Sequence, residues 1–178
     1  VSVQDAARLT LPGITQWART NSGDISLTVQ DAGSVLDLPN LTRATPQPYY
    51  EFELEVYSGG ELKLPLLSAI DGALNVFADG NGSTVRLPAL AGALVNTAPN
   101  MAHIETRNGA KVLIPAVTDL QKVNLRIRGA SEIPTTQIRS FKDADLLISD
   151  TTGNFPALVN IDGSSLTVEN GGQLTLNG

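Results

Sequence analysis

Apolar and polar residues alternate along this chain in a short phrase that returns at nearly even intervals. The phrase places a polar residue between two apolar ones, then a proline, and a further apolar residue two places later. Its copies are residues 8–15, 35–42, 61–68, 84–90 and 111–118. Strict alternation predicts a strand with one buried face. Proline cannot donate to a strand ladder, so it predicts a corner at the end of each strand.

A second alternating segment precedes most copies of this phrase. Its clearest examples are residues 25–29, 52–56 and 123–127, and the shorter segments 74–76, 102–104, 144–148 and 166–168 fit the same place. Turns rich in glycine and asparagine follow at 31–33, 58–60, 79–82, 108–109, 129–130 and 170–172. Glycine and asparagine tolerate the positive φ that such turns need. The pattern therefore predicts two strands in each repeat.

The last apolar residue of this second segment measures the repeat. The series is Val3, Val29, Val56, Val76, Ile104, Ile127, Ile148 and Val168. Its intervals run from 20 to 28 residues with a mean of about 24, a period typical of solenoids. Two weaker copies of the proline-marked phrase, the shortened 131–134 and the proline-free 159–162, fall in phase, so we include both.

We expect the apolar residues of the proline-marked phrase to stack as inward ladders from coil to coil. The inward pairs are Leu9/Leu11, Leu36/Leu38, Leu62/Leu64, Val85/Leu87, Val112/Ile114, Val159/Ile161 and Leu174/Leu176. The outward series between them is Thr10, Asp37, Lys63, Arg86, Leu113, Glu132, Asn160 and Thr175. Asp37 beside Lys63 predicts an exposed ion pair that contributes at most about 1 kcal/mol.

These patterns favour an all-β, single-chain parallel β-helix of about seven coils, each of 20–28 residues, over residues 1–178 as one domain. Right-handed crossovers between parallel strands are the rule, so we expect a right-handed helix. The alternative is a leucine-rich-repeat solenoid with a helical return, but no return segment has helical spacing. Insertions at 43–50 and 92–100 enlarge two coils, with smaller ones at 18–24 and 137–143, and insertions of this kind tend to gather on one side.

Composition narrows the function classes. The formal net charge of −6 argues against nucleic acid as a partner, because phosphate binding needs a basic surface. The chain has no cysteine, which excludes disulfides and thiolate metal sites. No run approaches 18 apolar residues, so we expect no membrane insertion.

The glycine-rich phrases at 59–65 and 170–178 resemble the irregular repeats of large bacterial surface and secreted proteins, such as filamentous adhesins and autotransporter passengers. The regular proline corner is not typical of those families. The resemblance implies an elongated β-helix that is extracellular or at the cell surface. The chain begins and ends within a repeat and lacks polar caps, so we expect a fragment of a longer array. Its partners would be neighbouring repeats of the same protein, other copies joined end to end through unpaired strands, or an unknown surface ligand.

Candidate catalytic and metal-binding residues are few. His103 is the only histidine, and we expect it to face solvent on a strand beside Glu105. Residues 79–82 read Asp-Gly-Asn-Gly but lack the further acids of a calcium loop, so we interpret them as a turn. The best acidic cluster is Asp143 and Asp145, which is weak as a carboxylate pair for glycoside chemistry. We therefore predict no catalytic residue, no metal site and no cofactor.

Aromatic residues give the only candidate binding cluster: Tyr49, Tyr50, Tyr57 and Phe77. We place Tyr57 and Phe77 in equivalent outward positions on neighbouring coils. Two stacked rings can form a sugar-binding platform, or they can be a cross-strand pair that stabilises the sheet by roughly 0.5–1 kcal/mol. We favour the cross-strand pair.

Two functional hypotheses follow from the sequence. The first is a non-catalytic structural or adhesive β-helical segment of a larger extracellular or cell-surface protein. The second is a polysaccharide-binding or polysaccharide-degrading module whose site is formed by the loops after Pro39 and Pro88.

Overall fold

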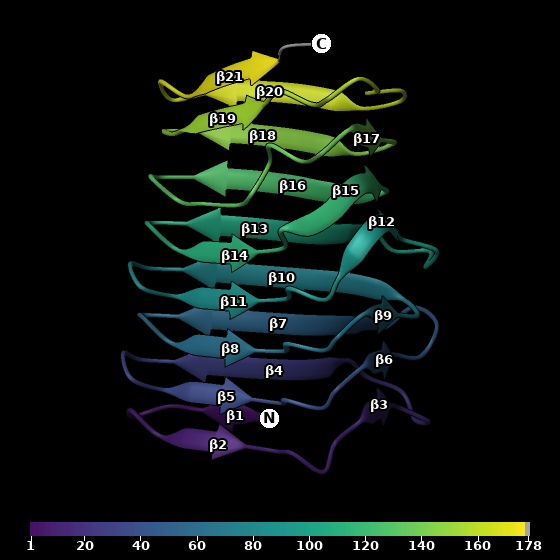
Figure 1. Cartoon of the computed structure of the whole chain (residues 1–178), viewed down its shortest axis with the longest axis vertical. Coiled ribbons are helices and arrows are strands. Elements are labelled where there is room, and N and C mark those ends of the chain that lie inside the picture. Colours follow the sequence, from purple (N-terminus) through teal and green to yellow (C-terminus); the bar gives the residue numbers. More distant parts are fainter. Residues whose placement is uncertain (177–178) are drawn as a thin grey trace.

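The computed structural model describes residues 1–176, and these residues form an all-β parallel solenoid (Figure 1). Each of the first five coils has a long strand, a turn, a short proline-marked strand, a corner and a third strand on the remaining side. In the sixth coil an isolated bridge at Glu132 replaces the proline-marked strand, and in the seventh an isolated bridge at Asn160 replaces the third strand. Every strand pair in the described residues is parallel and joins one coil to the next. The stack has about seven coils, which confirms the predicted parallel β-helix.

The long strands lie side by side in chain order and build one parallel sheet of eight. They are β1 (Ser2–Val3), β4 (Ile25–Gln30), β7 (Glu51–Tyr57), β10 (Ala73–Asp79), β13 (Ala102–Arg107), β16 (Val123–Arg128), β18 (Asp145–Ser149) and β20 (Ser165–Glu169). In β7 burial alternates at every residue, so one face of this strand packs on the core and the other faces outward.

The proline-marked strands form the second side. β2 (Arg8–Thr10), β5 (Val35–Asp37), β8 (Glu61–Lys63), β11 (Thr84–Arg86) and β14 (Lys111–Leu113) make one sheet, and β19 (Thr152–Phe155) pairs with β21 (Gln173–Leu176). The third side was not predicted as strand. It comprises β3 (Gln16–Ala18), β6 (Arg43–Thr45) and β9 (Ala69–Ile70), and then β12 (Ala91–Val95), β15 (Ala116–Gln121) and β17 (Ser140–Lys142). Most of these strands are short, and β12 contains a register shift, so they carry little alternation.

The predicted inward ladders form the core. Leu36, Leu62, Val85 and Val112 are in register on successive coils and have no solvent exposure. The residues two places after the corner prolines of the next four coils are also buried: Leu41, Leu67, Leu90 and Val117. Ile14 of the first coil is only partly buried. No helix occurs in residues 1–176, so the leucine-rich-repeat alternative was wrong.

The pairing of the long strands shows that two residues in the series used to measure the repeat are not the equivalents of their neighbours. Val56 pairs with Ala78 rather than with Val76, and Ile127 pairs with Thr106 rather than with Ile104. The expected apolar residue was missed there because one coil has a small alanine and the other a threonine. Thr106 is fully buried, and its hydroxyl has no hydrogen-bond partner among the described residues.

The proline-marked phrase of the seventh coil was placed wrongly. Val159 and Ile161 were predicted to point inward, but they are 80% and 41% exposed. Gly153 and Phe155 occupy the inward positions instead, and they pair with Leu174 and Leu176 of β21. Pro156 therefore marks the corner, and buried Leu158 follows it by two residues.

The outward series is confirmed as far as Leu113 and fails beyond it. Thr10, Asp37, Lys63, Arg86 and Leu113 follow one another in register. Glu132 bridges to Lys111 instead of Leu113 and forms an ion pair with it at 2.7 Å. In the last pair of coils Asn154, and not Asn160, lies beside Thr175.

The predicted pair between Asp37 and Lys63 forms in register but not as an ion pair. Lys63 Nζ lies 3.1 Å from a carboxylate oxygen of Glu61, and Arg86 Nε donates to the other oxygen at 2.7 Å. Partial burial by itself raises the pKa of Glu61, but the hydrogen bonds from Arg86 and Lys63 outweigh it and leave that pKa lowered.

Candidate functional site

The outward face of the long sheet contains a shallow hollow of about 350 Å³ over β7, β10 and β13. We call this hollow the sheet groove. Its lining residues are Glu53, Glu55, Tyr57, Asn75, Val76, Phe77, His103 and Glu105. Because side chains alternate along a strand, the residues that line the groove, apart from the core residue Val76, stand opposite those that build the core. The groove is thus carried directly by the rigid stack.

Tyr57 and Phe77 contact one another, but not as the equivalent pair that the sequence suggested. Phe77 is in register with Glu55, while Tyr57 is in register with Asp79. The two rings therefore meet diagonally, with centroids 5.5 Å apart and planes inclined by 47°. The guanidinium of Arg107 lies 5.0 Å from the centre of the Phe77 ring, a cation–π distance. The Phe77 ring therefore contacts both Tyr57 and Arg107.

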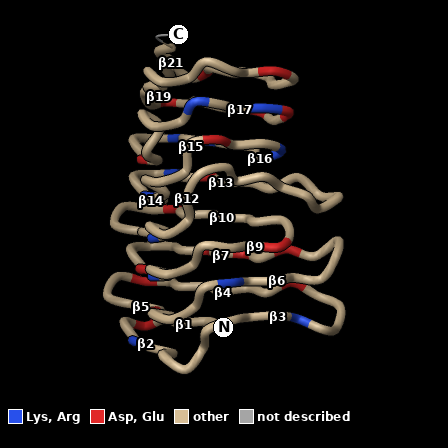
Figure 2. Tube along the Cα trace, turned by 45° about the vertical axis from the view of Figure 1, so that its right-hand side comes forward, with Lys and Arg blue, Asp and Glu red and all other residues tan. Residues whose placement is uncertain are grey.

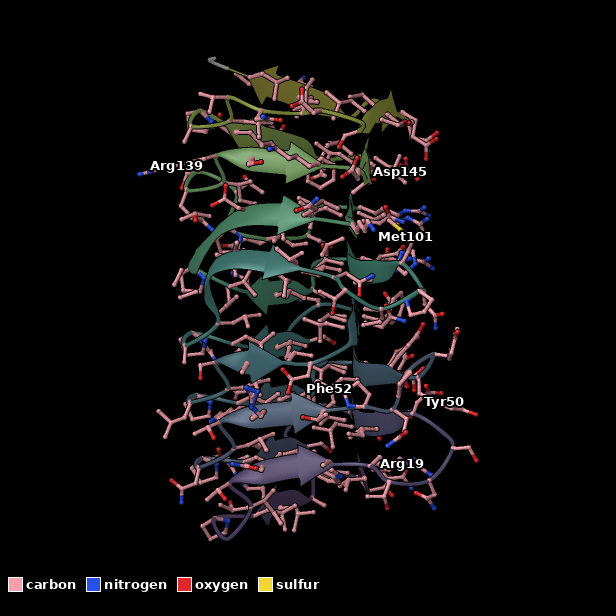
Figure 3. The ribbon with its side chains drawn as sticks, turned by 90° about the vertical axis from the view of Figure 1, so that its right-hand side faces the viewer. Arg19, Tyr50, Phe52, Met101, Arg139 and Asp145 are labelled. Carbon is pink, nitrogen blue, oxygen red and sulfur yellow. The ribbon has the colours of Figure 1, made fainter. Side chains whose placement is uncertain are left out.

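Tyr49 and Tyr50 are not part of this groove. Strand β7 separates them from Tyr57, and seven residues of extended chain span about 20 Å. Tyr49 is 70% exposed and has a positive φ of 69° in the loop before the strand. Figure 3 shows Tyr50 near the edge where the long strands begin, together with Met101 and Asp145, whereas Phe52 points into the stack. The four predicted aromatic residues thus belong to two separate regions.

Three arginines surround one glutamate at one side of the groove. Arg107 Nε lies 2.6 Å from Glu105 Oε1, Arg128 Nε lies 3.5 Å from the same oxygen, and Arg126 Nη1 lies 3.7 Å from Oε2. Glu105 is only 7% exposed, while each arginine side chain is more than one third exposed. We call Arg107, Arg126 and Arg128 the arginine cluster. Sequence inspection missed it because its members come from two coils.

The opposite side of the groove is acidic. Glu51, Glu53 and Glu55 project outward from the single strand β7. Burial and repulsion from Asp24 and the two neighbouring glutamates raise the pKa of Glu53. Burial and the nearby carboxylate of Glu55 also raise the pKa of the Tyr57 hydroxyl to about 12. Tyr57 therefore remains a neutral hydrogen-bonding group at physiological pH.

His103 lies on β13, the strand that also supplies Glu105 and Arg107. It faces outward into the groove as expected, but it is half-buried rather than fully solvated, and its Nδ1 lies 3.4 Å from the Asn124 side-chain amide. Burial and the positive charge of Arg126 lower the pKa of His103, against the opposing effects of Glu51 and Glu105. The ring is thus a neutral polar group at pH 7.

Replacing Glu53 by glutamine is expected to raise the melting temperature at neutral pH. The folded-state pKa of Glu53 lies above its ordinary value of 4.5, so its ionisation removes stability as the pH rises through the folded-state pKa. Below about pH 4.5 the carboxyl is protonated in both states, and the difference should vanish. Thermal unfolding followed by circular dichroism across this range measures the effect. A larger gain at pH 4 than at pH 7 would contradict this electrostatic assignment.

The two large insertions meet on one side of the stack, as the sequence predicted. The segment after Pro39 contributes residues 45–48 and the segment after Pro88 contributes residues 97–99 to a hollow of about 320 Å³, with Asp71 and Gly72 between them. Asn100 Nδ2 donates to the Tyr49 carbonyl at 2.9 Å and so links the two insertions. We call this the insertion hollow.

Proline and alanine supply most of the insertion hollow's apolar lining. Its carboxylate, Asp71, is already paired, because Arg43 Nη1 donates to it at 2.9 Å and the Thr45 hydroxyl donates to it at the same distance. In Figure 2 the blue segment on β6 and the red segment that follows β9 lie on neighbouring coils at this place. The insertion hollow therefore offers shape but little unpaired polar chemistry.

The remaining candidate acids do not assemble. Asp143 accepts a hydrogen bond from Gln121 Nε2 at 3.2 Å, and Asp145 is exposed at the start of β18. Asp79 begins the segment 79–82, which was interpreted from the sequence as a turn, and it accepts a hydrogen bond from Asn108 Nδ2 at 2.7 Å. Within residues 1–176, no three histidine or acidic side chains are grouped so as to hold a metal ion.

The fold defines the class of this chain as a parallel β-solenoid. Comparison with protein-family models, with curated proteins and with solved structures finds no match. The described residues also contain no helix that is long and apolar enough to cross a membrane.

Proposed function

We propose that the chain is a non-catalytic structural and adhesive segment of a larger extracellular or cell-surface protein, and that it binds its ligand through the sheet groove. The observation that carries this proposal is the groove itself, in which Tyr57, Phe77 and several polar side chains lie on a rigid parallel sheet. Aromatic faces and neighbouring carboxylates suit the apolar faces and hydroxyls of sugars. The resemblance to bacterial adhesin repeats supports an exported setting.

The rigidity of the stack supports a structural role. Apolar side chains from all three sides meet in one cluster that runs from Val3 to Leu158. Because each coil packs on the next, the stack resists bending and presents its outward residues at fixed spacing. A surface of this kind can hold an extended ligand that contacts several coils at once.

The chemistry of the groove favours binding over catalysis. A catalytic histidine needs a partner that orients its ring and a nucleophile or water within reach. The ring of His103 instead contacts an uncharged amide, that of Asn124. Glu105, the most deeply buried carboxylate of the groove, is committed to arginine.

Binding to a panel of immobilised neutral and acidic glycans tests this function. We expect the wild-type chain to bind at least one glycan, and Tyr57→Ser to weaken that binding by about tenfold. The matched control is Tyr49→Ser, which removes an exposed tyrosine outside the groove and should change binding by less than about twofold. Absence of wild-type binding, or an equal loss in both variants, would count against the proposal.

The insertion hollow is the second candidate binding site, in line with the polysaccharide module predicted from the sequence. The observation that favours it is the meeting of two insertions separated by an intervening coil. Thr97→Trp would fill this hollow without touching the groove. Loss of glycan binding in Thr97→Trp, with binding retained in Tyr57→Ser, would assign the ligand to the insertion hollow.

A further inference from the structure

The arginine cluster carries more positive charge and more donors than its glutamate can neutralise. Each guanidinium has five N–H donors, whereas one carboxylate accepts about four hydrogen bonds. Only Arg107 lies within 2.6 Å of Glu105, and the two other contacts are 3.5 and 3.7 Å long. The Nε of Arg128 is buried and has no hydrogen-bond partner in the described residues. Two positive charges therefore remain uncompensated by Glu105.

This excess charge adjoins the aromatic part of the groove. Arg107 lies over Phe77, and Phe77 packs against Tyr57, so one chain of contacts connects the arginine cluster to the tyrosine. Arg126 and Arg128 also line a neighbouring hollow over β16, β18 and β20, whose other polar residues are Ser165, Thr167, Asp145 and Glu169. Arginine donors, aromatic rings and hydroxyl groups thus form one band across the outward face of the sheet, with carboxylates at separate positions along it.

We propose that the arginine cluster binds the carboxylate or sulfate groups of an acidic polysaccharide that lies along this band. The inference rests on the proposed adhesive function and specifies the class of its ligand. Guanidinium groups form charge-assisted, bidentate hydrogen bonds with planar carboxylates and with the oxygens of tetrahedral oxyanions such as sulfate. The polymer's neighbouring sugar faces then contact Tyr57, and its hydroxyls find Asn75 and His103.

The position of the cluster disfavours two other polyanions. An extended acidic peptide gains much of its affinity by adding a strand to a sheet edge, but β13 and β16 are paired on both sides in the middle of the sheet. Nucleic acid needs a broad basic surface, whereas Glu53 and Glu55 line the other side of the groove and the chain has a net charge of −6. Sugar units with separated anionic groups fit the alternation of charge better.

The test compares four polymers by biolayer interferometry on the full chain: dextran, dextran sulfate, polygalacturonate and polyglutamate. We expect the wild type to bind dextran sulfate or polygalacturonate at least about tenfold more tightly than dextran. The two acidic polymers distinguish sulfate from carboxylate recognition. The double variant Arg126→Gln/Arg128→Gln should lose at least about tenfold of this affinity. The control Lys111→Gln/Arg139→Gln removes the same charge elsewhere and should retain it; Figure 3 shows Arg139 projecting away from the stack.

Glu105→Gln is expected to change the affinity for acidic polymers in the opposite direction to the arginine substitutions. Its amide oxygen still accepts from Arg107, but the negative charge that competes with the ligand is gone. We expect acidic polymers to bind about fivefold more tightly to this variant. A folding defect would instead weaken binding, so circular dichroism of every variant accompanies the measurement.

Several outcomes would overturn the inference while leaving the adhesive function intact. The first is equal affinity for dextran and dextran sulfate in a chain that binds both. The second is an equal loss of acidic-polymer affinity in the arginine double variant and its control. The third is weaker acidic-polymer binding by a folded Glu105→Gln variant. Tighter binding of polyglutamate than of either acidic glycan would assign the cluster to an acidic peptide. Failure of the wild type to bind any glycan, neutral or acidic, would instead contradict the adhesive function itself.

Discussion

Phe155→Ala is expected to lower the free energy of unfolding by about 3–5 kcal/mol, whereas Val159→Ala should change it by less than about 0.5 kcal/mol. Phe155 has no solvent exposure, and Val159 is 80% exposed. The two residues are four positions apart, yet one fills the core and the other lies on the surface. This contrast tests the placement of the whole coil.

The size of the expected loss follows from local packing. Gly153 occupies the inward position before Phe155, and a Cβ atom built there would lie 2.7 Å from Ile148 Cδ1 and 3.3 Å from Phe155 Cε2. The phenylalanine ring thus fills space that two aliphatic side chains share in other coils. Truncation to alanine would leave a cavity that no neighbouring inward side chain on β19 can occupy, because the neighbour is glycine.

Urea denaturation of both variants measures this contrast, with hydrogen exchange to locate it. In a solenoid each coil contacts mainly its neighbours, so the loss in Phe155→Ala should concentrate in the amides of β18, β19 and β21. A larger destabilisation by Val159→Ala than by Phe155→Ala would restore the inward position that the sequence pattern assigned to Val159.

The same coil explains where sequence reasoning failed. In the four coils from Leu36 to Ile114 the inward positions are two aliphatic residues before a proline, and the prediction was confirmed there. In the seventh coil a glycine and a phenylalanine replace them, and the alternating Val159 and Ile161 imitate the pattern a few residues later. Periodicity records polarity but not volume, so it could not recognise a small residue compensated by a large one.

The candidate site was predictable only in part. The sequence placed Tyr57 and Phe77 on outward positions of adjacent long strands and placed the insertions after Pro39 and Pro88 on one side. It could not supply the register of the sheet, which makes the ring contact diagonal. Nor could it bring Arg126 and Arg128 to Glu105, because that contact depends on which residues of consecutive coils stand side by side.

The position directly before the proline-marked strand is reserved for small residues. On successive coils this position is occupied by Ser34, Gly60, Ser83 and Ala110. The carbonyl oxygen of each of the first three accepts a hydrogen bond of 2.9 Å from the next coil, where the donor is the amide that follows the equivalent small residue. All four are buried. A Cβ atom added at Gly60 would already lie 2.9 Å from Val29 Cγ1. This turn therefore leaves little room for a larger side chain.

Ala110→Leu is accordingly expected to destabilise the chain by about 1–3 kcal/mol, because a larger side chain must displace this tightly packed turn. Ala110→Ser should be nearly neutral, since serine fills the same position at Ser34 and Ser83. Lys111→Leu places the same leucine on an exposed neighbour and controls for added hydrophobicity. The melting temperature of Ala110→Leu, measured by thermal unfolding, should be lower by several degrees, at about 2–4 °C per kcal/mol for a chain of this length. An Ala110→Leu variant as stable as Ala110→Ser would mean that the small residues are not required by packing.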